Sequence, residues 1–133
     1  MTVDLATAVR MIAAAHAEAE KRSILVSAAV VDAGGHLVAF GRMDGAEIAG
    51  PVLAVDKAYT SVANRIATSE LATLAAPGGD LFGLHTSGGG RFVIFGGGVP
   101  VTIDGVVVGG VGVSGASAAE DEACALAALR CLG

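Results

Sequence analysis

Hydrophobic residues recur at helical spacing near the start of the chain. The intervals between them are four, three, four and three residues, and charged side chains lie off this stripe. Apolar positions with this period form one face of an amphipathic helix. The sequence therefore predicts a helix over residues 4–22, with this face against the core. The stripe consists of Leu5, Val9, Ile12, His16 and Ala19.

The next segment changes to a pattern typical of extended chain. Residues 26–31 form a short apolar run, and residues 36–40 resume an extended pattern after an Asp-Ala-Gly-Gly sequence at 32–35. Two apolar runs joined by a glycine pair predict a β-hairpin. We expect the carboxylate of Asp32 to bind the backbone of its own turn.

A second helix is predicted over residues 51–67. Pro51 suits the first helical position, where the N–H that it lacks would have no partner in any case. Residues 68–75 favour a further helical turn or two. Pro-Gly-Gly and Gly-Gly-Gly bracket the segment 77–90, which indicates a loop with one helical turn over 80–85. The apolar stripe of the second helix comprises Val52, Val55, Tyr59, Val62 and Ile66.

Three strands and a last helix are predicted in the remainder of the chain. Asp104-Gly105 is a strong signal for a tight hairpin turn between the second and third of these strands. The sequence Ser-Ala-Ala-Glu at 117–120 has the form of a helix capping box. Antiparallel strands with helices before, between and after them predict an α+β fold. The three strands are expected over residues 92–95, 99–103 and 106–113.

The composition and net charge limit the classes of protein to which the chain can belong. The 133 residues are 53% hydrophobic but only 4% aromatic and include 20 glycines, so we expect one domain, residues 1–133, whose core is built from small side chains. The net charge is −5 without a basic cluster, which argues against nucleic acid as a partner. No apolar run reaches the length of a membrane span and no secretory signal is evident, so a cytoplasmic location is expected.

Two cysteines occur near the end of the chain. Cys124 and Cys131 fall seven residues apart in one predicted helix. That spacing separates them by about 10 Å along the axis, which excludes a disulfide between them. We expect both to be reduced thiols in the core.

The stretch GVGVSG at residues 110–115 matches the dinucleotide-binding fingerprint G-x-G-x-x-G. Only 18 residues follow it and they form a helix, so the second strand of a nucleotide-binding βαβ unit cannot be built. We expect Gly109, Gly110 and Gly112 to let a helix or a neighbouring subunit approach the strand. An anion held by free N–H groups at the start of the last helix remains an alternative.

Several stretches together resemble the GlcG and HbpS family, which includes the C-terminal domain of PduO-type corrinoid adenosyltransferases. They run through nearly the whole chain in the family's order. The resemblance implies a five-stranded antiparallel sheet with helices on both faces, of the profilin and roadblock type, in a homo-oligomer. Some relatives bind haem. The matching stretches are VVDAGGHLVAFGRMDGA at 30–46, Lys57-Ala58, GGGVPV at 96–101, DGVVVGGVGVSG at 104–115 and Glu120-Asp121-Glu122.

Three histidines are candidates for binding haem iron, which takes His, Cys, Met or Tyr ligands beside an apolar slot. His16 falls within the first apolar stripe and His36 leaves a tight turn, so both have simpler structural explanations. His85 lies in the glycine-bracketed loop, where Leu81 and Phe82 would form an apolar wall beside it. We predict that His85 and Phe82 contact a ligand beneath a mobile lid, or else that the loop only seals the sheet.

A second group of candidates combines charge with glycine-rich backbone. Arg42 can bind a carboxylate in bidentate fashion, and Asp44 lies two residues after it. Lys57 can act as a base if its pKa is lowered. The structural alternative is an Arg-Asp or Lys-Asp pair that ties a strand end to a helix. No metal-ligand spacing occurs. The predicted substrate-binding set is Arg42, Asp44, Gly97, Gly98 and Ser114, with His85 and Lys57 as catalytic candidates.

Two functions remain in play. The first is a protein that binds haem, a corrinoid or another flat or anionic small molecule between loop 77–91 and the sheet, often across a subunit interface. The second is a small catabolic enzyme that acts on an organic acid by proton transfer or hydrolysis. A purely structural assembly module is a weaker third hypothesis. The scarcity of aromatic residues disfavours haem as an obligate cofactor.

Overall fold

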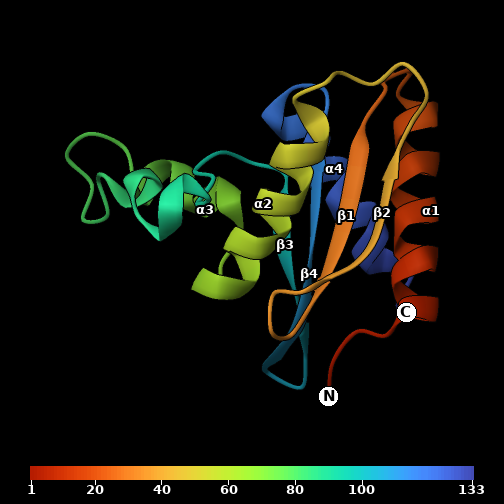
Figure 1. Cartoon of the computed structure of the whole chain (residues 1–133), viewed down its shortest axis with the longest axis horizontal. Coiled ribbons are helices and arrows are strands. Elements are labelled where there is room, and N and C mark those ends of the chain that lie inside the picture. Colours follow the sequence, from red (N-terminus) through yellow and green to blue (C-terminus); the bar gives the residue numbers. More distant parts are fainter.

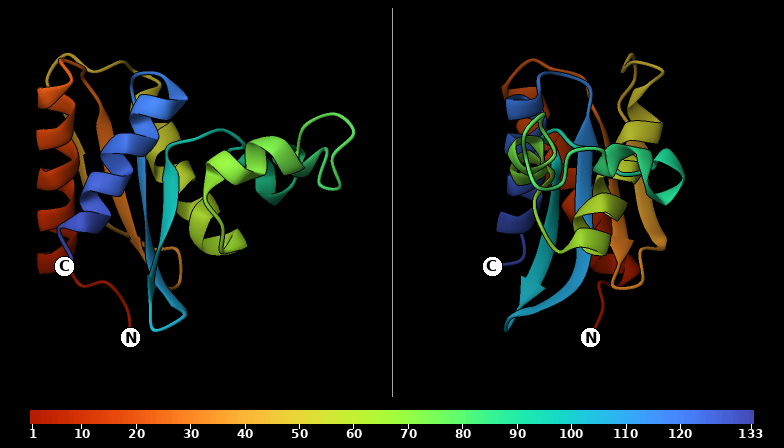
Figure 2. Two further views of the ribbon diagram at one scale, coloured as in Figure 1. Left: turned by 180° about the vertical axis from the view of Figure 1, so that it is seen from behind. Right: turned by 90° about the vertical axis from the view of Figure 1, so that its left-hand side faces the viewer.

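An antiparallel sheet of four strands lies between two helical layers in the computed structural model, which describes residues 1–133 (Figure 1). The strands lie in the order β2-β1-β4-β3. On one face of the sheet lie α1 and α4, and on the other lies α2, followed by the short helix α3 (Figure 2). The strands are β1 (Ser27–Asp32), β2 (Leu37–Arg42), β3 (Gly98–Ile103) and β4 (Val106–Ser114). The helices are α1 (Leu5–Lys21), α2 (Gly50–Asn64), α3 (Thr68–Leu74) and α4 (Ala118–Arg130).

The α+β class is confirmed, but the expected fifth strand is absent. Residues 92–95 were predicted as a strand, whereas the chain there is irregular and joins no ladder. The backbone N–H of Val93 donates instead to Thr60 Oγ1 on α2, at 3.0 Å. The Phe92 ring packs on Tyr59 with centroids 6.3 Å apart. Contacts with a helix thus replace the strand pairing that the apolar run predicted.

Helix α1 forms where expected, but a different face is buried. Leu5 and Val9 are 60% and 54% exposed, so the prediction that the stripe faces the core is wrong for these two residues, although Ala19 of the same stripe is buried. Because alanine has the smallest apolar side chain, the alanine-rich face lets α1 lie close to the sheet and to α4. The bulkier stripe lies beside it, with Ile12 and His16 against Gly41 of β2. The buried residues of α1 are Ala8, Met11, Ala15 and Ala19.

The glycines of β4 allow α2 to pack against the sheet. A Cβ atom on Gly112 would overlap the carbonyl of Ala54, and one on Gly110 would overlap Ser61 and Val62. The predicted structural role of these glycines is therefore confirmed. The nucleotide-like stretch is a central strand covered by a helix, with no open phosphate loop.

The predicted turns and the final helix cap are confirmed in detail. Asp104 and Gly105 both have positive φ, 50° and 78°, as a tight hairpin turn requires. The Ser117 side chain accepts from the Glu120 N–H, and the Glu120 carboxylate accepts from the Ser117 N–H.

Both cysteines are free, and burial raises the pKa of Cys124 to about 11, so its thiol stays protonated at neutral pH. No helix of the structure has both the length and the apolarity that a bilayer span requires.

An arm formed by α3 and loop 77–91 projects away from the sheet (Figures 1 and 2). The loop contains two short 3₁₀ turns, Leu84–Thr86 and Gly88–Gly90, so the helical turn predicted over 80–85 forms slightly later. Phe82 is 63% exposed and Leu81 is also exposed. The arm therefore presents apolar side chains to its surroundings and does not close over the sheet of its own chain.

The β1–β2 turn makes a pH-dependent contribution to stability. The carboxylate of Asp32 accepts from the N–H groups of His36 and Gly34, as predicted, and these bonds lower its pKa below 3.8. The carboxylate therefore stabilises the folded state above that value, and this contribution is lost as the pH falls through the lower pKa of the folded state. We expect the stability difference between the wild type and Asp32→Asn to shrink as the pH falls from about 5 to about 2. Urea denaturation at each pH measures it, and a constant difference would contradict this assignment.

Candidate functional site

A buried ion pair joins α2 to α4 at one end of the sheet. Lys57 is 1% exposed, and its Nζ donates to Asp121 Oδ2 at 3.1 Å and to the Val113 carbonyl at 2.9 Å. The other carboxylate oxygen, Oδ1, accepts from the N–H of Ala116 at 2.9 Å. The Phe95 ring lies over the ammonium, with its centroid 5.1 Å from Nζ. Both charges are therefore paired within the chain.

Burial acts against the charge on each member of the pair. It lowers the pKa of Lys57, while Asp121 and the more remote Glu47 oppose that shift. Burial likewise raises the pKa of Asp121, against the effects of the Lys57 charge and the Ala116 N–H. The favourable contacts between the partners offset part of the cost of removing them from water. This arrangement matches the structural alternative foreseen for Lys57, a Lys-Asp pair, although the carboxylate comes from Asp121.

The two predicted glycines lie against Lys57, and Ser114 follows Val113, whose carbonyl accepts from the Lys57 ammonium. A Cβ atom on Gly97 would lie 2.7 Å from the Lys57 ammonium, and one on Gly98 would overlap the Lys57 carbonyl. Ser114 is buried, and it pairs across the ladder with Ser27 of β1. Because Gly97 and Gly98 have no side chains, there is room for the Lys57 side chain between α2 and β4. Their role in substrate binding stays a prediction.

Sequence reasoning missed two buried polar residues, Asp121 of the ion pair and Ser27 of β1. In the sequence Asp121 belongs only to the family-like stretch Glu120-Asp121-Glu122, and in the first turn of α4 a carboxylate is also expected to stabilise the positive end of the helix dipole. Its pairing with Lys57, 64 residues away, depends on tertiary structure and has no local signal. Ser27 Oγ is buried and has no hydrogen-bond partner, and nothing in the flanking sequence distinguishes this serine from others.

Arg42 and Asp44 do not join the buried pair through any hydrogen bond or ion pair. The Arg42 guanidinium donates twice to the carbonyl of Ala46, at 3.1 and 2.6 Å, and closes the loop that follows β2. Asp44 is exposed in that loop. The expected cluster of Arg42, Asp44 and Lys57 is therefore not connected in the folded chain.

The three histidines occupy different surroundings. His16 Nε2 lies 3.0 Å from the Gly41 carbonyl, and His36 Nδ1 lies 3.1 Å from Asp32 Oδ1. His85 is exposed on the arm and its ring makes no hydrogen bond. Its nearest aromatic neighbour is Phe82, edge-on with ring centroids 6.5 Å apart. The structure thus brings together the two residues predicted to contact a cofactor.

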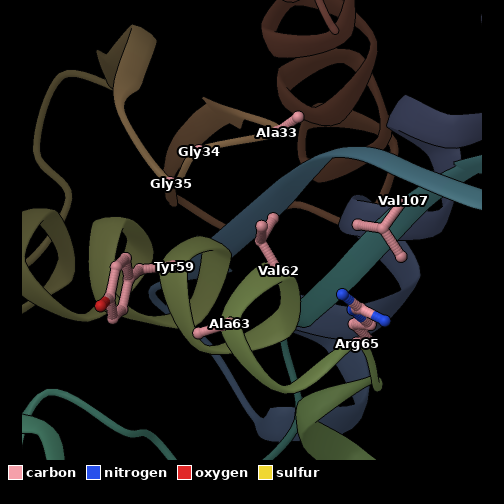
Figure 3. A pocket seen from close by; sticks show the side chains of 8 residues that line it. All are labelled: Ala33, Gly34, Gly35, Tyr59, Val62, Ala63, Arg65 and Val107. Atoms are coloured by element: carbon pink, nitrogen blue, oxygen red, sulfur yellow. The ribbon is translucent and has the colours of Figure 1, made fainter. Parts of the chain in front are cut away.

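Four hollows open on the surface, with volumes of 230 to 280 Å³. One lies between α3 and the start of α4 and includes Phe95, next to the buried pair. Another lies between α2 and the β1–β2 turn (Figure 3). All are smaller than the roughly 300–1,000 Å³ of pockets that enclose drug-sized ligands, and His85 lines none of them.

Comparison with known proteins places the chain in a family. A family model described as "Haem degrading protein HbpS-like" matches residues 3–130. The chain belongs to the HbpS-like family. An uncharacterised 15.0 kDa protein of Citrobacter freundii, from the dhaT-dhaS intergenic region, is 40% identical over 98% of this HbpS-like chain and 92% of its own length. The resemblance noted from the sequence is thereby confirmed.

Two further relatives of this HbpS-like protein bear on function. The corrinoid adenosyltransferase PduO of Salmonella typhimurium is 39% identical over 81% of the chain, but the match spans only 32% of PduO. The crystal structure of a PduOC–haem complex superposes with a TM-score of 0.93 at 34% identity, covering 98% of this chain and 94% of that one. The shared part thus corresponds to PduOC, and that protein is known as a haem complex.

Proposed function

We propose that this protein binds haem, with His85 as an axial ligand and Phe82 against the porphyrin. The observation that carries the proposal is the state of His85: its ring is exposed and has no hydrogen bond, and it stands beside exposed apolar side chains of the arm. Haem binding by the structurally similar PduOC supports it. Bound haem would supply a redox-active iron.

Most other side chains that can bind iron are less available than His85; the exceptions are the exposed Met1 and the half-buried Tyr59 and Cys131, none of which lies on the arm. The rings of His16 and His36 are already hydrogen-bonded, and the Met43 sulfur accepts from the Val26 N–H. Met11 and Cys124 are fully buried. The donor set therefore fits haem best at the arm.

One chain does not enclose a ligand of this size. The hollows of the surface hold at most 280 Å³, and none includes a residue of loop 77–91. A haem on His85 would leave one of its faces in water, which is unfavourable for an apolar macrocycle. We therefore propose that a second copy of the chain covers the arm, so that the protein binds haem as a homo-oligomer.

The geometry does not favour the enzyme hypothesis. A base must reach a proton of its substrate, but the Lys57 ammonium is buried and bonded to Asp121 and Val113. Arg42, the expected carboxylate anchor, is committed to the Ala46 carbonyl. His85, the other candidate base, is free, but it lines no hollow in which a substrate could be held beside it.

Haemin titration followed by visible absorbance tests the proposal. We expect the wild type to shift the Soret band with saturable binding, and His85→Ala to bind at least about tenfold more weakly, because the axial bond is lost. We expect Phe82→Ala to weaken binding less, since it removes only an apolar contact.

His36→Ala is the matched control. His36 is also an exposed histidine near a turn, but its ring is paired with Asp32. It should bind haemin as the wild type does. No Soret shift with the wild type, or equal binding by His85→Ala and the wild type, would contradict the proposal.

A further inference from the structure

We propose that the hollow between α2 and the β1–β2 turn binds a small organic carboxylate, with Arg65 as its anchor. The hollow has a volume of 240 Å³. Arg65 lies at one end and Tyr59 at the other, with Val62 between them (Figure 3). This site is separate from the His85 arm and does not depend on haem binding.

Arg65 has no partner for its charge within the chain. Of the six arginines, three donate to a carboxylate or carbonyl of the chain, and a fourth, Arg130, forms an ion pair with Glu18 at 3.7 Å. Arg10 makes no such bond, but its charge lies close enough to Asp4 to lower the pKa of that carboxyl. Arg65 forms no side-chain hydrogen bond and no ion pair, although it borders the hollow. The four arginines with such partners are Arg22, Arg42, Arg91 and Arg130.

The backbone at Arg65 is unfavourable for a residue with a long side chain. Arg65 ends α2 in the left-handed region, with φ 55° and ψ 42°, and its N–H bonds to the carbonyls of Ser61 and Val62. Glycine adopts this conformation without steric cost and is the usual residue at such helix ends. A strained residue that also places an unpaired cation at a hollow points to a role for its side chain.

The polar groups around the hollow define the class of ligand. The N–H groups of the neighbouring turn are already used, because Gly34 and His36 donate to the Asp32 carboxylate. The hollow therefore offers one positive charge and a planar guanidinium, which suits a singly charged carboxylate better than a phosphate dianion. Apolar groups of Val62, Ala63 and Val107 line part of the hollow, beside the Tyr59 ring and the backbone of the turn. A short aliphatic body attached to the carboxylate would contact them.

Calorimetric titration with butyrate tests the assignment on the full chain. We expect the wild type to bind butyrate and Arg65→Gly to bind it at least about tenfold more weakly. The affinity of Arg65→Lys should lie between them, because lysine keeps the positive charge but lacks the planar guanidinium that binds a carboxylate through two N–H groups. Because glycine relieves the left-handed strain, Arg65→Gly should also melt at a higher temperature than the wild type. Loss of binding with a gain in stability separates a ligand role from a structural one.

Ser23→Gly is the matched control. Ser23 follows α1, also has a positive φ of 56°, and does not line the hollow. This variant should melt higher as well, yet bind butyrate as the wild type does. The proposal is overturned if the wild type shows no butyrate binding at about 1 mM ligand, if Arg65→Gly binds butyrate equally well, or if inorganic phosphate binds more tightly than butyrate.

Discussion

Lys57→Met is expected to lower the free energy of unfolding by about 3–5 kcal/mol. The substitution leaves Asp121 buried without its counter-charge and removes a donor from the Val113 carbonyl. Methionine occupies a similar volume, so the loss would come mainly from unpaired polar groups and only to a small extent from a cavity. Urea denaturation of the purified variant measures the effect.

The double variant Lys57→Met/Asp121→Asn distinguishes the ion pair from simple packing. Asparagine is neutral, yet its carbonyl oxygen can still accept from the Ala116 N–H, so the double variant should be more stable than Lys57→Met alone. Lys21→Met is the surface control, since Lys21 is 76% exposed and lies 3.7 Å from Glu18. It should cost less than about 1 kcal/mol. Equal losses for the two lysine variants would refute the importance of the buried pair.

Gly112→Ala is expected to destabilise the protein by about 3 kcal/mol, at the upper end for an added methyl group. The new Cβ would overlap the Ala54 carbonyl and the Ala58 N–H of α2. These are backbone atoms within a helix, so no side-chain rotation can relieve the clash. The helix as a whole would have to move away from β4. The loss can be measured as a lower urea midpoint.

Gly34→Ala provides the comparison for this effect. Its Cβ would clash only with the side chain of His36, which is exposed and can rotate away, and would lie in ordinary contact with Asp32 Oδ1 at 3.5 Å. We expect a change within about 0.5 kcal/mol, as for ordinary surface substitutions. A similarly small change for Gly112→Ala would show that α2 does not need the glycine in order to pack.

Local chemistry was predictable wherever its signal lies within a few residues. The hairpin turn at Asp104-Gly105, the capping box at 117–120 and the turn bonds of Asp32 all formed as expected. Each depends on hydrogen bonds or backbone angles between near neighbours, so all the interacting residues lie within one short stretch of sequence. The joint position of His85 and Phe82 on one loop has the same origin.

The site around Lys57 was only half predictable. The sequence pointed to Lys57 and to a possible lysine–aspartate pair, but proposed Asp44 as the nearby carboxylate. In the structure α2 and α4 lie on opposite faces of the sheet, and the Lys57 side chain, from the middle of α2, reaches the end of β4 and Asp121 in the first turn of α4. Which carboxylate reaches the lysine depends on how helices from distant parts of the chain pack.

The sequence by itself determined the family, the α+β class, the position of each helix and the need for glycine in β4. The family follows from the resemblance of several stretches to known members, and the other properties follow from periodicity, from short turns and from residue types that tolerate one backbone geometry. Only the tertiary structure decided that residues 92–95 pack on α2 and form no strand, that the alanine face of α1 is buried, and that Arg65 has no partner. Those outcomes depend on competition between contacts far apart in the sequence, because burial and pairing are properties of the assembled chain.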